Sequence, residues 1–109
     1  MNFREYQDLA RSTAIYPNIG NNIYYPTLGL CGESGEVAEK IKKIMRDDGG
    51  IVSEEKKELL KKEISDVLWY CAALCSELGF DMNDVAESNI KKLLDRKNRG
   101  VVGGSGDNR

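Results

Sequence analysis

The sequence predicts an all-α protein, an antiparallel bundle of about four helices that oligomerisation completes. Apolar residues recur about every 3.6 positions over long stretches, as they do on one face of a helix. No stretch shows the period of two that is typical of a strand. Short segments rich in glycine, proline and asparagine separate the helical stretches, and short connections favour antiparallel neighbours.

The first two helices are predicted at residues 3–15 and 26–46. Asn2 can cap the first helix because its side-chain oxygen can accept a hydrogen bond from a free backbone N–H. Pro26 suits the first turn of the second helix, where no backbone donor is needed. The loop between the two helices is rich in asparagine and glycine and is punctuated by two Tyr-Pro dipeptides. The second helix is expected to carry one apolar arc at a period of 3.6 residues: Leu30, Val37, Ala38, Ile41, Ile44 and Met45.

The third helix is predicted at residues 54–78, with Ser53 as its N-cap and Gly79 at its C-cap. Its second half is a run of nine residues without a charge, which indicates a buried helix. The fourth helix begins at Asp81 or Asn83 and reaches about Arg96–Arg99. It is expected to bury a second apolar arc: Val85, Ala86, Ile90, Leu93 and Leu94.

Length and charge limit the functional classes. A chain of 109 residues is one domain by size, and small domains of this kind often gain from oligomerisation. The net charge of −2 argues against non-specific nucleic-acid binding, so no nucleic-acid partner is expected. There is no signal-peptide pattern and no apolar run that could span a membrane. We therefore expect a cytoplasmic protein without a membrane partner.

The chain contains no histidine and three cysteines. The absence of histidine excludes imidazole-based triads, His-bearing zinc sites and the Glu-x-x-His di-iron site. Proton transfer must therefore fall to a carboxylate, a tyrosine, a lysine or a metal-bound water. The cysteines fit a reducing compartment. Cys71 and Cys75 are interpreted as small core residues, with a metal or redox pair as the alternative.

The strongest functional pattern is two acidic pairs, each at a spacing of three: Glu33 with Glu36, and Glu63 with Asp66. Residues three apart share a helix face, so the pairs can converge if their helices are antiparallel neighbours. Converging carboxylates repel one another unless cations neutralise them. Oxygen donors suit a hard cation such as Mg²⁺, which indicates phosphate chemistry. The alternative is a set of structural ion pairs with Lys40 and Lys62.

Five further residues are candidates for substrate binding: Gln7, Tyr70, Asn89, Lys92 and Arg96. Tyr70 lies one turn beyond Asp66 and could stack on a base, or it could be a core tyrosine. Asn89 faces inward beside two cations and suits an anionic ligand. The alternative is a backbone-bonded amide with two snorkelling bases. Gln7 could read a base edge or bond to neighbouring backbone.

Glycines leave two further questions open. Gly29 and Gly32 fall on the carboxylate side of the second helix, where missing side chains could admit a ligand or allow close helix packing. Residues 100–109 form a Gly-rich tail, interpreted as flexible, with closure over a phosphate as the alternative.

The segments GESGEVAEK (residues 32–40) and KEISDVLWY (residues 62–70) together resemble the MazG-like family of all-α nucleoside triphosphate pyrophosphohydrolases. That family carries Glu-x-x-Glu, a variable spacer, which has 26 residues here, and Glu-x-x-Asp before an apolar run. Residues 89–96 (NIKKLLDR) are similar to the family's Asn-x-x-Lys-Leu-x-x-Arg pattern. One departure is Gly32, which stands where many members carry another glutamate.

The resemblance implies that residues 1–99 form a MazG-like domain with Mg²⁺ as cofactor and Mn²⁺ as a substitute. Such an enzyme cleaves a nucleoside triphosphate between its α- and β-phosphates, giving a monophosphate and pyrophosphate, in nucleotide-pool house-cleaning. It implies a homodimer or homotetramer with sites near subunit boundaries. Its metal ligands would be Glu33, Glu36, Glu63 and Asp66.

Within that reading, Glu33 or Glu36 is the catalytic proton acceptor, since no histidine is present. Lys92 and Arg96 would neutralise the outer phosphates, Asn89 would orient them, and Gln7, Trp69 and Tyr70 would contact the base. The rival functions are a nucleotide-sensing domain without catalysis and a helical interaction module.

Overall fold

The computed structural model describes residues 1–109 and contains four helices and no strand. They are α1 (Phe3–Ser12), α2 (Tyr24–Asp47), α3 (Glu54–Leu78) and α4 (Met82–Asn98). The all-α class and the four predicted helices are confirmed. None of these helices combines the length and the hydropathy that a membrane span requires.

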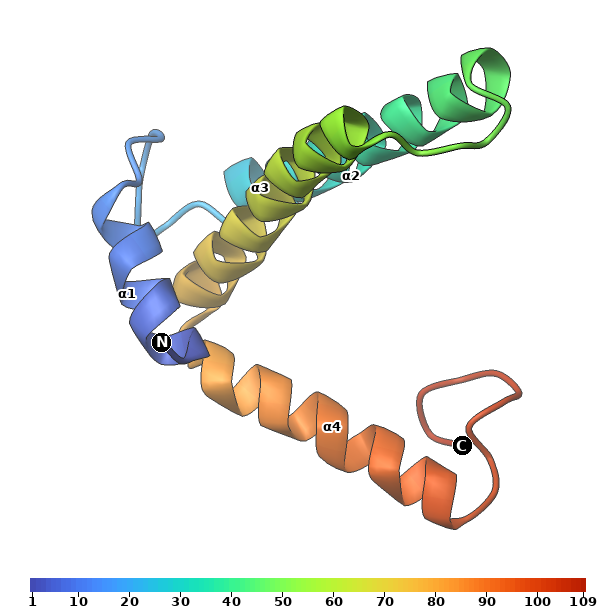
Figure 1. Cartoon of the computed structure of the whole chain (residues 1–109). Helices are drawn as coiled ribbons and strands as arrows, with labels where there is room; N and C mark the ends of the chain where they lie inside the picture. The colour runs from blue at the N-terminus through green and yellow to red at the C-terminus, as the bar shows by residue number, and fades with distance from the viewer.

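Helices α2 and α3 form a long antiparallel hairpin, and α1 packs across the C-terminal half of α3 (Figure 1). The small core lies at this crossing, where Ala10 of α1, Ala72 of α3 and Met82 of α4 meet. Tyr6, Leu68 and other partly buried side chains pack around them. The uncharged run of α3, residues 67–75, is therefore the helix segment against which α1 and the start of α4 pack.

Local sequence signals set most helix ends. The Ser53 side chain accepts a hydrogen bond from the Lys56 N–H, and Gly79 ends α3 in the left-handed region at φ 74°. Helix α1 ends at Ser12, before the predicted residue 15. Its last turn is closed by the Thr13 hydroxyl, which donates to the Ala10 carbonyl at 2.7 Å. Pro17 also disfavours a helical conformation in the residue before it.

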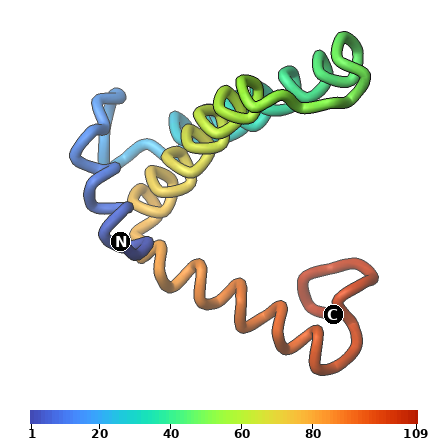
Figure 2. The backbone as a smooth tube through the Cα atoms, viewed as in Figure 1, coloured from blue at the N-terminus to red at the C-terminus, as the bar shows by residue number.

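The direction of α4 differs from that of a compact bundle. Helix α4 starts at the junction with α1 and then runs away from the α2–α3 hairpin (Figures 1 and 2). The prediction that its apolar arc is buried is wrong for the single chain, because Val85, Ile90 and Leu94 are 44%, 56% and 53% exposed. No other helix of the chain packs over that face.

Gln7 holds α4 at the junction. Its amide nitrogen donates to the Ser76 hydroxyl at 3.1 Å and to the Phe80 carbonyl at 2.8 Å. Its amide oxygen accepts from the Met82 N–H at 2.8 Å. Because both ends of the buried amide are used, Gln7 fastens α1 to the turn between α3 and α4.

Candidate functional site

Three of the four predicted carboxylates gather between α2 and α3. One oxygen each from Glu33, Glu63 and Asp66 lies within 4.8 Å of the others. The two helices run antiparallel and pack side by side, and Glu33 of α2 thereby lies next to Glu63 and Asp66 of α3. Three carboxylates at this spacing form an all-oxygen donor set, which fits a hard divalent cation such as Mg²⁺.

The charge balance of this acidic cluster is strongly negative. Partial burial, the charge of Asp66 and a hydrogen bond with Glu63 raise the pKa of Glu33 above its usual range. The basic group that pairs with the cluster is Lys40, whose Nζ lies 3.7 Å from Glu63 Oε1. Lys62 makes no ion pair with the cluster. Of the two lysines in the ion-pair alternative, only Lys40 pairs with a carboxylate of the cluster. One lysine cannot neutralise three carboxylates, so the cluster keeps an excess of negative charge.

Glu36 lies apart from the three clustered carboxylates. It is exposed, one turn further along α2, and makes no hydrogen bond or ion pair. Its charge still makes the smallest contribution to the raised pKa of Glu33. Gly32 is also exposed, with open space around it, so the chain supplies no fifth carboxylate at that position.

An aromatic cavity of about 380 Å³ opens directly beside the acidic cluster. Glu33 and Asp66 form part of its wall, and the remaining walls come from the end of α1, the following loop, the first turn of α2 and α3. The rings of Tyr16 and Tyr25 stack at 4.8 Å, and the Trp69 indole donates to the Thr13 hydroxyl at 2.9 Å. The cavity is therefore lined mainly by aromatic rings and carboxylates. The lining residues are Thr13, Ile15, Tyr16, Tyr25, Glu33, Asp66, Trp69 and Tyr70.

Tyr70 links this cavity to the helix hairpin. Its ring packs directly on the backbone of Gly29, where an added Cβ would overlap three ring carbons. It also meets Trp69 edge-on at 5.0 Å and Tyr25 at 6.4 Å. Of the two interpretations of Gly29, close helix packing is the one that the structure supports. Burial, then Tyr25 and the nearby carboxylates, raise the pKa of Tyr70.

Comparison with known proteins connects this geometry to a family. Residues 26–101 match the family model described as the MazG nucleotide pyrophosphohydrolase domain. The chain belongs to this family. A protein of Mycobacterium phage L5, named Gene 37 protein, is 46% identical over 109 residues, which cover 95% of this chain and 96% of that protein. No solved structure matches the chain.

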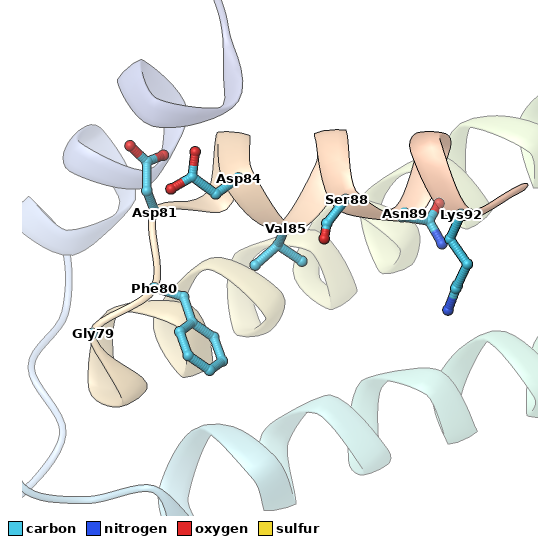
Figure 3. A pocket seen from close by; sticks show the side chains of 8 residues that line it. All are labelled: Gly79, Phe80, Asp81, Asp84, Val85, Ser88, Asn89 and Lys92. Atoms are coloured by element: carbon cyan, nitrogen blue, oxygen red, sulfur yellow. The ribbon is translucent and has the colours of Figure 1, made fainter. Parts of the chain in front are cut away.

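The part that matches the MazG family includes both acidic pairs and the polar residues of α4. In this single chain, those α4 residues are not part of the acidic cavity. Asn89 and Lys92 line a separate groove of about 580 Å³ along α4 (Figure 3). In that view Phe80, Val85 and Lys92 extend to one side of the helix, and the carboxylates of Asp81 and Asp84 lie on the other. Arg96 is buried beneath the tail.

Two features of the site were not assigned from the sequence. Tyr16 and Tyr25 precede the two prolines of the α1–α2 connection; neither tyrosine was given a role in the site, and both lie before the MazG match. A repeated aromatic residue at both ends of one loop was the available signal. Gln7, predicted as a base contact, instead has its amide engaged at the α4 junction, which agrees with the alternative of bonding to neighbouring backbone.

Proposed function

We propose that this MazG-family chain is a Mg²⁺-dependent nucleoside triphosphate pyrophosphohydrolase that cleaves between the α- and β-phosphates. The products would be a nucleoside monophosphate and pyrophosphate. The observation that carries the proposal is the cluster of Glu33, Glu63 and Asp66 beside an aromatic cavity, in a chain of a nucleotide pyrophosphohydrolase family. The role in the cell would be removal of unwanted nucleotides.

The acidic cluster would hold the cation. A bound Mg²⁺ would offset phosphate charge and make water a better nucleophile. Glu33, Glu63 and Asp66 would be its ligands, and Mn²⁺, which prefers similar donors, would substitute for it. The raised pKa of Glu33 supports this assignment, because it reflects partial burial together with repulsion from neighbouring carboxylates, which a cation would offset.

Glu36 would accept the proton from the attacking water. It lies one helical turn from Glu33, outside the three clustered carboxylates, is exposed and has no partner that would compete for its oxygens. With no histidine in the chain, a carboxylate is the available general base near this site. Glu33, the other candidate for this role and the one that is crowded by two carboxylates, is better suited as a ligand.

The aromatic cavity would receive the base. Rings stack on nucleobases of any sequence, and stacking is worth about 1–3 kcal/mol per base. Tyr25 and Trp69 offer ring faces beside the carboxylates, so the base and the phosphates could lie in one continuous site. Tyr70 would serve mainly to shape the cavity, since its ring is packed against Gly29.

Residues from a second copy would complete the phosphate site. Asn89, Lys92 and Arg96 lie on α4, which runs away from the acidic cluster of its own chain. The exposed apolar arc of the same helix suits burial against another copy. We therefore propose a homodimer or homotetramer in which α4 of one protomer brings cations and an amide toward the phosphates held by its partner.

Product analysis tests the reaction. Ribo- and deoxyribonucleoside triphosphates would be incubated with the protein in Mg²⁺ or in EDTA, and the products separated by ion exchange. We expect monophosphate and pyrophosphate only with Mg²⁺. Asp66→Asn should lower the rate at least about 100-fold, since it removes charge at the metal. Glu39→Gln, on the exposed face of α2 and outside the cluster, should leave the rate nearly unchanged. Release of orthophosphate and a diphosphate would overturn the proposed cleavage position.

Thermal melting separates the enzyme from its rivals. A cation that binds only the folded protein raises the melting temperature. A helical interaction module predicts no response to millimolar Mg²⁺, whereas a nucleotide sensor predicts Mg²⁺-dependent nucleotide binding without products. The enzyme predicts both a Mg²⁺ response and products, and Asp66→Asn should weaken both.

A further inference from the structure

The tail of residues 100–109 folds back onto the predicted phosphate-binding side of α4 (Figure 2). The Asp107 carboxylate lies 3.1 Å from Lys92 Nζ and 3.3 Å from Arg96 Nη2. Arg96 also donates to the Asp107 backbone carbonyl at 2.5 Å. A side-chain anion of the chain itself thus occupies the two cations that the proposed function gives to the substrate phosphates.

The tail forms a closed loop around Arg109. The Arg109 guanidinium donates to the carbonyl oxygens of Val101, Val102, Gly103 and Gly106. Gly100, Gly104 and Gly106 have φ values of 71°, 93° and 83°, which favour glycine. The Val101 N–H also donates to the Arg96 carbonyl at 2.8 Å, which ties the loop to the end of α4. These contacts hold Asp107 over the cation pair.

We propose that this tail is a tethered competitor for polyphosphate: Asp107 occupies the Lys92–Arg96 pair and must leave before phosphate binds there. The proposal rests on the proposed function for the identity of the ligand, a polyphosphate. It goes beyond that function because it assigns a regulatory role to a segment outside the acidic cluster and the aromatic cavity.

The ion pairs of Asp107 with Lys92 and Arg96 are weak enough for the tail to detach and rebind. Arg96 is buried, but Asp107 is 82% exposed and Lys92 is 40% exposed, and ion pairs whose carboxylate has that much solvent access are weak. A polyphosphate carries several charges and offers paired oxygens that match the guanidinium fork. Substrate at sufficient concentration would therefore displace the tail, so that the tail sets the concentration at which the cation pair becomes occupied.

Calorimetry with inorganic tripolyphosphate in EDTA tests this on the full chain. No turnover is needed, so the test is independent of whether the chain hydrolyses nucleotides. If the docked tail is populated about four-fifths of the time, Asp107→Asn should lower the Kd about fivefold. Lys92→Gln should weaken binding, and adding Asp107→Asn to it should have less effect than in the wild type.

Asp95→Asn is the matched control. It makes the same change in net charge on α4, but Asp95 pairs with Arg99 and not with the cation pair. We expect it to change the Kd by less than about twofold, as general charge effects at a distance are screened. Equal effects of the two variants, weaker binding by Asp107→Asn, or no tripolyphosphate binding by either protein would overturn the proposal. Circular dichroism would check that all variants keep the helices.

Discussion

At the scale of single residues, the decisive feature is that three carboxylates gather where the chain supplies one nearby lysine. Glu33, Glu63 and Asp66 share a region within 4.8 Å, and Lys40 reaches only the edge of it. The raised pKa of Glu33 is the direct consequence of burial and of this crowding. A folded protein keeps such an arrangement at a cost, which a bound cation would offset.

The absence of a side chain at Gly29 allows close packing of α2 against α3 beside the acidic cluster. Gly29 lets the Tyr70 ring lie against the α2 backbone, next to the acidic cluster. We predict that Gly29→Ala destabilises the protein by about 1–3 kcal/mol, because the new Cβ overlaps the ring and the helices must shift. Urea unfolding followed by circular dichroism measures the change.

Gly35→Ala is the control on the same helix, since nothing lies within 4 Å of a Cβ at that position. It should stabilise the protein by about 0.5–1 kcal/mol through the better helix propensity of alanine. Equal stabilisation by both substitutions would show that the Gly29–Tyr70 contact does not form in solution.

At the scale of elements, the loop between α1 and α2 is held by one carboxylate from α3. The Glu77 side chain is 0% exposed. It accepts hydrogen bonds from the Tyr16 hydroxyl at 2.6 Å and from the Gly20 N–H at 3.0 Å, and it pairs with Arg11. These bonds fix the loop residues that wall the aromatic cavity. Burial alone would raise the pKa of Glu77, but the hydrogen bonds outweigh it, so the pKa is lowered.

We predict that Glu77→Gln lowers the free energy of unfolding by about 2 kcal/mol near neutral pH, because buried donors lose a charged acceptor. The pH dependence follows from the lowered pKa. The unfolded chain takes up a proton near the ordinary value of 4.5 and the folded chain only at lower pH, so this stabilisation is lost as the pH falls through that window.

Urea unfolding of wild type and Glu77→Gln, from neutral pH down to about pH 3, measures the difference between them. The difference should shrink below the ordinary glutamate pKa. Glu87→Gln, at an exposed and unpaired position on α4, should show little difference at any pH. A difference that stays constant with pH would contradict the role given to the Glu77 charge.

At the scale of the whole molecule, the single chain buries little. Only 9 of 109 residues are buried, and the apolar arc of α4 faces outward. A small domain gains most of its stability from apolar burial, so a chain with so small a core benefits from assembly with other copies. The direction of α4 leaves both its apolar arc and the far side of the hairpin available for such packing.

We predict that the protein is a dimer or tetramer in solution and that Ile90→Asp shifts it toward the monomer by placing a charge on the α4 arc. Size-exclusion chromatography with light scattering measures the mass. Ser12→Asp adds the same charge at an exposed position at the end of α1, away from the α4 arc, and should keep the assembly. A wild-type protein that stays monomeric at high micromolar concentration would contradict the proposed composite site.

Local rules account for what was predicted correctly. The bounds of α3 follow from the Ser53 cap and the left-handed Gly79, and both signals act within one turn of the chain. The spacing of three that puts Glu63 and Asp66 on one helix face is also a property of a single helix. The family follows from the same motifs, because they are contiguous in sequence.

Which side chains from different helices lie together follows from the tertiary structure and not from the sequence pattern. Four helices, most of their caps, the two acidic pairs and the absence of histidine can be read from the sequence alone, although α2 begins at Tyr24 without a side-chain cap. The fold decided that Glu33 joins the cluster while Glu36 stays outside it, and that the Tyr16–Tyr25 stack borders the carboxylates. The physical reason is that residue spacing sets the faces of one helix, whereas the rotation of α2 against α3 depends on contacts such as that of Tyr70 with Gly29, which join residues far apart in the chain.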